Sequence, residues 1–137
     1  MFDIVTKYIG GWGNEQITYA FEGYKGGECV ATVVRTAVTE LHLDVKADSL
    51  TLKEGDTYDA TRIQMVALDQ NGNRVPFADS TVKVTVKGAA KIIGPSEFPL
   101  IGGDRAFWIR TNGEKGDITV TIDAKSIEKV TLKLKAE

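Results

Sequence analysis

From residue 38 to the end of the chain, apolar and polar residues alternate with a period of two. In ELHLDVKA, for example, Leu41, Leu43 and Val45 are separated by polar or charged residues, and STVKVTVKG repeats the pattern with valines. Successive side chains of a β-strand point to opposite faces, so this pattern predicts strands with one face in a core and the other in water. The fold class is therefore predicted to be all-β.

Turn residues separate the alternating segments and set the length of each predicted strand. The predicted strands are ELHLDVKA, TRIQMVALD, STVKVTVKG, AFWIR, DITVTI and VTLKLK, with turns at KEGD, Asn71–Gly72, Gly102–Gly103, Asn112–Gly116 and Asp123–Ser126. Seven or so short strands, spaced by about 8–12 residues, are typical of an immunoglobulin-like antiparallel β-sandwich. Alternation does not encode which strands pair, so the strand order stays open. Pro76, Pro95 and Pro99 are all expected between strands.

The first 37 residues have a different pattern. FDIVTKYI, residues 2–9, places apolar residues at helical spacing before two glycines, and is also rich in strand formers, so a short helix and a strand are both open. QITYAFEGY and ECVATVVRTAV flank Lys25–Gly27, which predicts a hairpin with Gly26 and Gly27 in its turn. We expect residues 1–37 to be the trailing segment of a preceding module, and 38–137 to be the sandwich. The abrupt start suggests that Met1 is an expression start within a longer protein.

The charge and hydropathy of the chain argue against nucleic acids and membranes as binding partners. The 137 residues carry 17 Lys and Arg against 19 Asp and Glu, interleaved, with a net charge of −2. This is not the basic footprint of a nucleic-acid binder, and we expect no nucleic acid as partner. No segment reaches the roughly 18 apolar residues of a membrane span, and no secretory signal begins the chain, so we expect no membrane partner. Cys29 has no second cysteine to pair with and is expected to be an inert thiol on a strand.

One segment resembles a calcium-binding loop. Asp69, Asn71 and Asn73 stand at the spacing of the first three ligands of such a loop. However, its glycine, Gly72, is fourth instead of sixth, and the twelfth position is Ser80 where a glutamate is required. Asparagine and glycine favour tight turns, so we expect a turn and no metal site.

The sequence also contains no recognisable combination of catalytic residues. His42 is the single histidine and is expected on the solvent face of a strand, away from a nucleophile. Glu54, Asp56 and Asp59 share one polar turn, whereas glycoside cleavage needs two carboxyl groups facing each other across a cleft. No glycine-rich phosphate loop is present. We therefore expect no catalytic residue and no cofactor.

Aromatic residues are the best candidates for a binding function. Tyr8 and Trp12 belong to an aromatic-rich N-terminal part, and Phe107 and Trp108 are adjacent on a predicted strand, so they must point to opposite faces. Exposed aromatics pack against other domains or stack on sugar rings. We expect mainly packing, and retain Trp12, Trp108 and Tyr8 as candidates for carbohydrate contact.

These motifs together resemble the C-terminal β-sandwich region of glycoside hydrolase family 2, the β-galactosidase and β-glucuronidase group. The likeness covers almost the whole chain. It is carried by KYIGGWG, EGDTYD, the D-x-N-G-N-x-x-P segment at Asp69–Pro76, K-I-I-G-P at Lys91–Pro95, and the paired glycines followed by an aromatic strand at Gly102–Trp108. In that family, the two catalytic glutamates lie on a preceding (β/α)₈ barrel. No residue of this chain matches a catalytic motif of the family.

The resemblance implies a non-catalytic accessory domain of a bacterial glycosidase, cytoplasmic or secreted. Its partners would be the remaining domains of the parent enzyme, and a second subunit in the case of subunit association. Two alternatives of other classes remain open. One is a carbohydrate-binding module that uses exposed aromatics, and the other is an immunoglobulin-like repeat of a bacterial surface adhesin.

Overall fold

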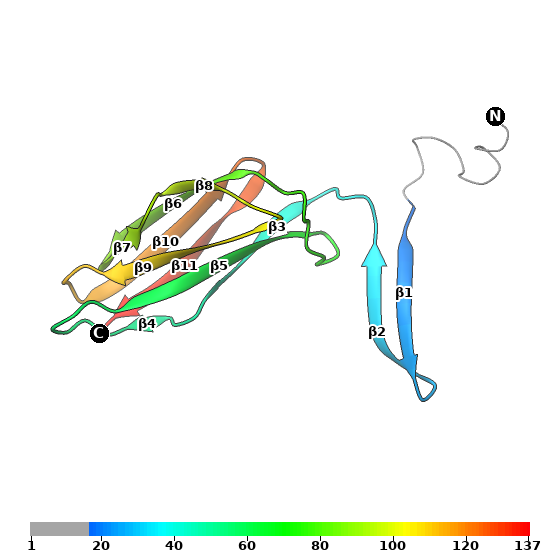
Figure 1. Cartoon of the computed structure of the whole chain (residues 1–137), viewed down its shortest axis with the longest axis horizontal. Helices are drawn as coiled ribbons and strands as arrows, with labels where there is room; N and C mark the ends of the chain where they lie inside the picture. The colour runs from blue at the N-terminus through cyan, green and yellow to red at the C-terminus, as the bar shows by residue number, and fades with distance from the viewer. Residues whose placement is uncertain (1–16) are drawn as a thin grey trace. The chain divides into compact units, whose positions relative to one another are not determined.

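The computed structural model describes residues 17–137, which form only strands, turns and loops (Figure 1). The chain divides into two compact units, Met1–Thr39 and Glu40–Glu137. Each unit is described by itself. In chain order the strands are β1 (Tyr19–Lys25), β2 (Glu28–Arg35), β3 (Leu41–Ala47), β4 (Thr51–Leu52), β5 (Ala60–Asp69), β6 (Thr81–Gly88), β7 (Ala90–Ile93), β8 (Glu97–Pro99), β9 (Asp104–Thr111), β10 (Gly116–Ala124) and β11 (Ile127–Ala136).

In the first unit, β1 and β2 form an antiparallel hairpin. Gly26 and Gly27 make its two-residue turn with φ angles of 62° and 84°, a conformation that glycine adopts without a steric penalty. The predicted hairpin and its turn are therefore confirmed. A bulge shifts the strand register after Gly23. The segment 2–9, predicted as a short helix or strand, lies outside the described residues.

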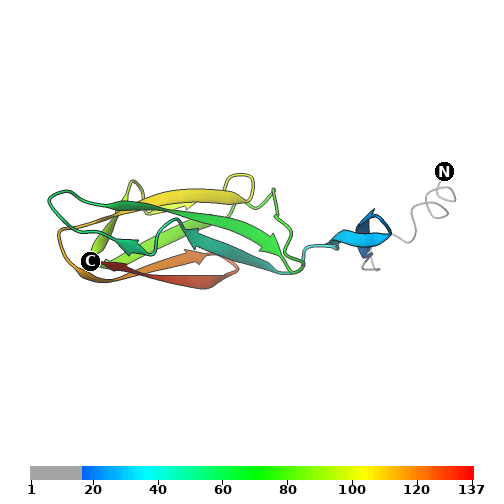
Figure 2. The ribbon, with the colours of Figure 1, turned by 90° about the horizontal axis from the view of Figure 1, so that it is seen from below.

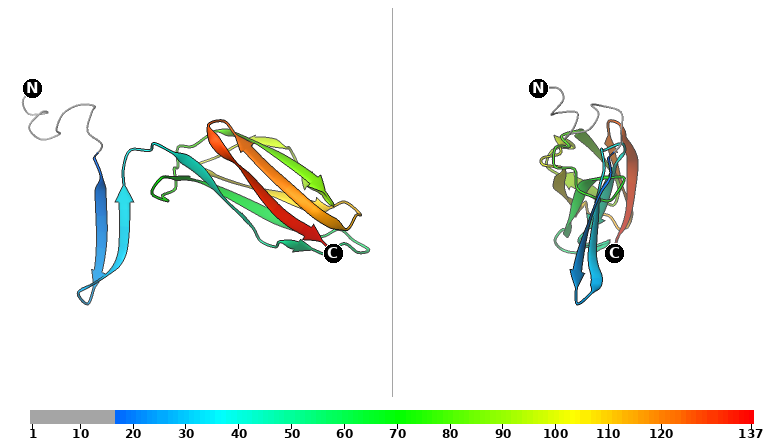
Figure 3. Two further views of the ribbon diagram at one scale, coloured as in Figure 1. Left: turned by 180° about the vertical axis from the view of Figure 1, so that it is seen from behind. Right: turned by 90° about the vertical axis from the view of Figure 1, so that its right-hand side faces the viewer.

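The second unit is a sandwich of two sheets, seen as two stacked layers in Figure 2. One sheet has the order β4-β11-β10-β6-β8 and the other the order β3-β5-β9-β7. All pairs are antiparallel except the short parallel pair of β4 with β11. Figure 3 shows β10 and β11 as neighbouring strands of the five-stranded sheet. The predicted all-β antiparallel sandwich is confirmed, and the immunoglobulin-like type stays a prediction.

The core lies between the two sheets and follows the alternation of the sequence. On β5, Ile63, Met65 and Ala67 are fully buried, and the intervening side chains point away from the core. Phe98 and Phe107 meet in the core with their ring centroids 5.8 Å apart. Because a flat pleated strand exposes every second residue, each strand carries one core face and one outer face.

The position of Pro99 differs from the one that the sequence predicted. We expected it between strands, but it ends β8, the edge strand of the five-stranded sheet. The neighbouring Leu100 donates its N–H to Ser80, and Ser96 accepts from Val84, so the backbone groups of alternate residues face β6. The nitrogen of Pro99 points the other way, to the open edge, where a missing N–H breaks no pairing.

Candidate functional site

Phe107 and Trp108 are neighbours on β9 that point to opposite faces of the four-stranded sheet. Phe107 is 5% exposed in the core, whereas Trp108 is 48% exposed on the outer face. The predicted division of this pair is confirmed. An indole ring left half open to water on a sheet face is a candidate contact surface.

Trp108 lies in a row of cross-strand neighbours that runs across the outer face of this sheet. Arg62 on β5 pairs with Trp108 on one side, and Ile93 on β7 pairs with it on the other. Asp48, just after β3, donates its N–H to the carbonyl of Arg62 and holds the guanidinium through two contacts, Oδ2 to Nε at 3.1 Å and Oδ1 to Nη2 at 3.3 Å. The row therefore places an apolar centre beside a guanidinium of fixed direction.

A second aromatic ring lies next to this row. Arg110 is two residues after Trp108 on the same face of β9, and its guanidinium carbon lies 4.6 Å from the ring centroid of Tyr58. Such a cation–π contact orients both side chains while leaving Tyr58 exposed. We name the set Trp108, Ile93, Arg62, Arg110 and Tyr58 the Trp108 patch.

The outer face of the five-stranded sheet has a different chemistry. Its central rows consist of lysine, threonine and aspartate side chains, namely Lys87, Thr119 and Lys133 in one row, Thr85, Thr121 and Thr131 in the next, and Lys83 with Asp123 in a third. Lysine and threonine faces of this kind are ordinarily solvated. Among the exposed large apolar side chains of residues 40–137, Ile93 and Trp108 lie on strands, both of the four-stranded sheet. The others, Leu50, Tyr58, Phe77 and Ile101, lie outside the strands.

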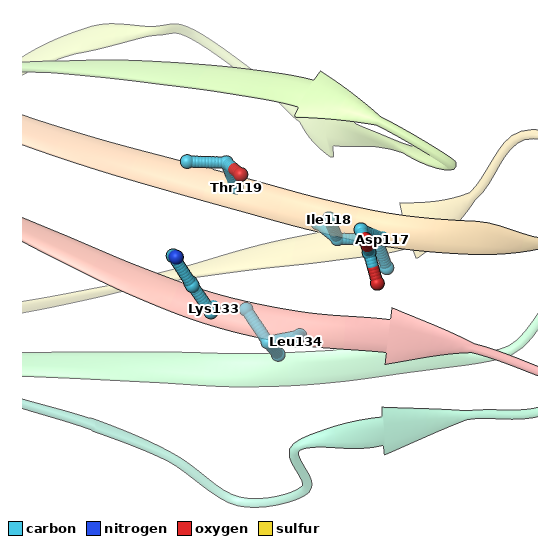
Figure 4. A pocket seen from close by; sticks show the side chains of 5 residues that line it. All are labelled: Asp117, Ile118, Thr119, Lys133 and Leu134. Carbon is cyan, nitrogen blue, oxygen red and sulfur yellow. The ribbon is translucent and has the colours of Figure 1, made fainter.

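A hollow of about 180 Å³ opens between β10 and β11 on the five-stranded sheet (Figure 4). Thr119 and Lys133 project from neighbouring strands beside it, with Asp117 at one end, and the core residues Ile118 and Leu134 complete its lining. Its lining contains a single carboxylate, that of Asp117. It therefore lacks the two facing carboxyl groups that glycoside cleavage requires.

The calcium-like segment is a tight turn closed by its own aspartate. The Asp69 carboxylate is buried, and its Oδ1 accepts the N–H groups of Asn71 and Asn73, each at 2.9 Å. The carbonyl of Asp69 accepts the N–H of Gly72, whose φ is 78°. This geometry is that of an Asx turn, as the sequence predicted. In residues 17–137, no group of three or more His, Cys, Asp and Glu side chains is arranged to hold a metal ion.

Two carboxylates of the acidic segment KEGDTYD, residues 53–59, accept backbone hydrogen bonds. Asp59 accepts the N–H of Lys53 and of Ala60, both at 2.9 Å, and Glu54 accepts the N–H of Gly113 at 3.3 Å. The sequence predicted that Glu54, Asp56 and Asp59 share one polar turn, with their carboxylates in solvent. In the structure Asp56 is exposed, but Glu54 and Asp59 are partly buried because their carboxylates accept backbone N–H groups of the surrounding loops.

The remaining sequence candidates are not brought together. His42 is exposed on β3, as expected. Cys29 is on β2 as expected, but it is exposed, since the hairpin has no core in which to bury a thiol. Tyr8 and Trp12 lie outside the described residues. Within residues 17–137, the structure has no helix of the length and hydrophobicity that a bilayer crossing demands.

Comparison with known proteins decides the family. Residues 43–133, from β3 to β11, match the family model "Glycoside hydrolase family 2 C-terminal domain 5". The chain belongs to glycoside hydrolase family 2. Its sandwich is therefore a family 2 C-terminal domain.

Relatives of this family 2 domain include β-galactosidases. The chain is 36% identical over 104 residues to a β-galactosidase of Thermoanaerobacterium thermosulfurigenes, covering 74% of this chain and 14% of that protein. It is 30% identical over 107 residues to a β-galactosidase of Rhizobium radiobacter, covering 72% and 77%. A β-glycosidase structure from Bacteroides vulgatus superposes with a TM-score of 0.71 at 19% identity, covering 88% of this chain and 17% of that one. The chain thus spans about a seventh of the first relative.

Sequence reasoning found Trp108 of the family 2 domain but missed its neighbours. The contact between Tyr58 and Arg110 joins residues far apart in the chain, so no local pattern indicates it. Ile93 was detectable, since adjacent Ile92 and Ile93 on one strand must face opposite sides. The pairing that puts Ile93 beside Trp108 depends on strand order, which the sequence left open.

Proposed function

We propose that this chain is a non-catalytic C-terminal accessory domain of a family 2 glycoside hydrolase whose full-length form is β-galactosidase-like. The observation that carries the proposal is the match of residues 43–133 to a C-terminal domain model, together with coverage of only 14% of a β-galactosidase relative. The hydrolytic residues then belong to the rest of the parent protein. The domain serves packing between domains or association of subunits.

The Trp108 patch is the surface we assign to this packing. Its centre is apolar and its rim is charged, which is how protein interfaces are generally built. The opposite outer face, with its lysines and threonines, has no such centre. Tryptophan, tyrosine and arginine are also the residue types that most often dominate binding energy at interfaces.

Two measurements test the proposal. The purified 137-residue chain should not hydrolyse a chromogenic β-galactoside or β-glucuronide, whereas the full-length parent should hydrolyse one of them. In the parent, Trp108→Ala should lower the thermal stability or weaken subunit association, with Thr119→Ala on the opposite face as the matched control. Turnover by the 137-residue chain itself would overturn the proposal.

A second candidate function is carbohydrate binding at the Trp108 patch. The observation in its favour is that the half-exposed indole ring stands beside Arg62, whose guanidinium Asp48 holds in one direction. A flat apolar ring next to fixed donors suits a sugar, which has an apolar ring face and a rim of hydroxyls. Titration with galactose-containing oligosaccharides, followed by calorimetry, tests it with Trp108→Ala as control. Absence of heat at millimolar sugar would exclude this candidate.

A further inference from the structure

The hairpin of the first unit has two faces of different chemistry. Cross-strand pairing places Tyr19 opposite Arg35, Phe21 opposite Val33, and Gly23 opposite Ala31 on one face. Directly paired residues share a face of the sheet, so Tyr19, Phe21, Ala31 and Val33 form one apolar surface, with the charged Arg35 at its open end. We name these four residues the apolar hairpin face. Phe21 at its centre is 61% exposed.

The other surface is mixed. Ala20 pairs with the half-buried Val34 at the open end of the hairpin, and polar side chains follow toward the turn. Glu22 pairs with Thr32, and Tyr24 pairs with Cys29. The Tyr24 hydroxyl donates a hydrogen bond to the Glu22 carboxylate, which raises the pKa of Tyr24 above its usual value. Cys29 Sγ lies 3.4 Å from the Thr32 hydroxyl. We name Glu22, Tyr24, Cys29 and Thr32 the polar hairpin face.

A hairpin with this composition requires a partner for its apolar side. Two strands alone are only marginally stable in water, and three or more strands or a packed layer are needed to hold such a sheet. The burial pattern of β1 and β2 is exposed throughout, apart from the half-buried Val34. Both outer edges of the hairpin also carry strand backbone, to which further strands can add.

The comparisons indicate where the partner lies in the chain. The match to the Bacteroides vulgatus structure covers 88% of this chain, which is more than the second unit, Glu40–Glu137, can supply by itself. A counterpart of part of the first unit is therefore present in that larger protein. Only 17% of the larger chain is matched, and the matching family model is a C-terminal domain, so the remaining chain is on the N-terminal side.

We propose that the apolar hairpin face is an interface that closes over an apolar β-sheet in the module preceding this sequence in the parent enzyme. The hairpin adds its two strands to that module as an outer layer, and the polar hairpin face stays in water. Sheets stack about 10 Å apart by interdigitating side chains, so Tyr19, Phe21 and Val33 fit a partner surface of aliphatic and aromatic side chains. The inference rests on the proposed function, since it requires a longer parent enzyme.

Thiol labelling tests the two faces separately. Phe21→Cys and Val33→Cys, each combined with Cys29→Ser, report on the apolar hairpin face. Thr32→Cys with Cys29→Ser, and the native Cys29, report on the polar hairpin face as matched controls. Each variant is made in the 137-residue chain and in the full-length parent, and labelling by N-ethylmaleimide is quantified by peptide mass spectrometry, which separates these sites from other cysteines.

In the 137-residue chain, all four thiols should react at similar rates. In the parent, thiols at positions 21 and 33 should react at least about tenfold more slowly, because labelling then requires local opening, while positions 29 and 32 should be unchanged. Equal rates at all four positions in the parent would overturn the inference. So would protection of the polar hairpin face, or protection of position 21 already in the 137-residue chain at high concentration, which would indicate self-association.

The unmodified protein provides a second measurement that does not depend on the folding of cysteine variants. Hydroxyl-radical footprinting should show lower modification of Tyr19 and Phe21 in the parent than in the 137-residue chain, with Tyr24 modified equally in both. The proposed function fails separately, through turnover by the 137-residue chain. Unprotected hairpin residues in a parent whose isolated domain is inactive would overturn this inference alone.

Discussion

Asp59, just before β5, and Thr111, at the end of the neighbouring strand β9, are joined by two hydrogen bonds. The N–H of Asp59 donates to the Thr111 hydroxyl at 3.1 Å, and the N–H of Thr111 donates to the Asp59 carbonyl at 2.9 Å. The Thr111 side chain is fully buried at the end of β9. This pair fastens the loop before β5 to the neighbouring strand.

Thr111→Val tests this fastening. Valine has the same shape but no oxygen, so the Asp59 N–H loses its acceptor in a partly buried site, which should reduce the free energy of unfolding by about 1 to 3 kcal/mol. Urea denaturation of the 137-residue chain measures the loss. Thr111→Ser keeps the hydroxyl and should lose less than valine does. A valine variant as stable as the wild type would show that the hydroxyl has no such role.

The Asp69 turn gives a second expectation. Asp69→Ala removes the acceptor of the Asn71 and Asn73 N–H groups and should lower the free energy of unfolding by about 1 to 3 kcal/mol. Asp69→Asn keeps one carbonyl oxygen and should be intermediate. Because this carboxylate is occupied by the turn, millimolar calcium should leave the melting temperature of the wild-type chain unchanged. A calcium-dependent rise would restore the metal-loop interpretation.

Alanine substitutions at two glycines with nearly equal φ angles distinguish the cost of backbone strain from the cost of a steric clash. Gly88 and Gly94 have φ of 94° and 93°, but a Cβ on Gly88 would lie 2.0 Å from the Asp117 carbonyl oxygen, while one on Gly94 meets nothing within 4 Å. Gly94→Ala should therefore lose about 1 to 2 kcal/mol from the positive φ alone. Gly88→Ala should exceed the roughly 3 kcal/mol of ordinary substitutions, measured by thermal unfolding. Equal losses would contradict the close approach of β6 and β10.

Phe107 and Trp108 provide a matched pair on one strand. Phe107→Ala leaves a cavity in the core and should reduce the free energy of unfolding by about 3 to 5 kcal/mol. Trp108→Ala removes a half-exposed ring and should cost well under half of that in the 137-residue chain. Denaturant unfolding of both variants checks the contrast. A Trp108 loss as large as that of Phe107 would mean that the indole ring stabilises the isolated domain, and would weaken its assignment as an interface.

The alternation of apolar residues was sufficient to predict the strands and which side of each is buried. Val82 and Val84 are in the core as expected, and Leu43 faces it from the other sheet. The sandwich followed from these local patterns because a strand with one apolar side must bury that side against a second layer. Turn residues added the hairpin at Gly26–Gly27 and the Asp69 turn.

Sheet order and cross-strand neighbours were not predictable. The pairing of β5 with both β3 and β9 is set by contacts between distant residues, and it is this pairing that places Arg62 beside Trp108. The same limit explains Asp59, whose role depends on backbone groups brought to it by folding. Trp108 itself was predictable because its position relative to Phe107 depends only on the geometry of one strand.

The outermost strands of the five-stranded sheet are unusually short, two residues in β4 and three in β8, which ends at Pro99. Long open edges act as templates on which strands of other molecules pair and aggregate, and short edges with proline prevent this. The five-stranded sheet therefore offers a neighbouring β-rich chain no long edge on which to pair, whereas the four-stranded sheet has the seven-residue β3 at one of its edges.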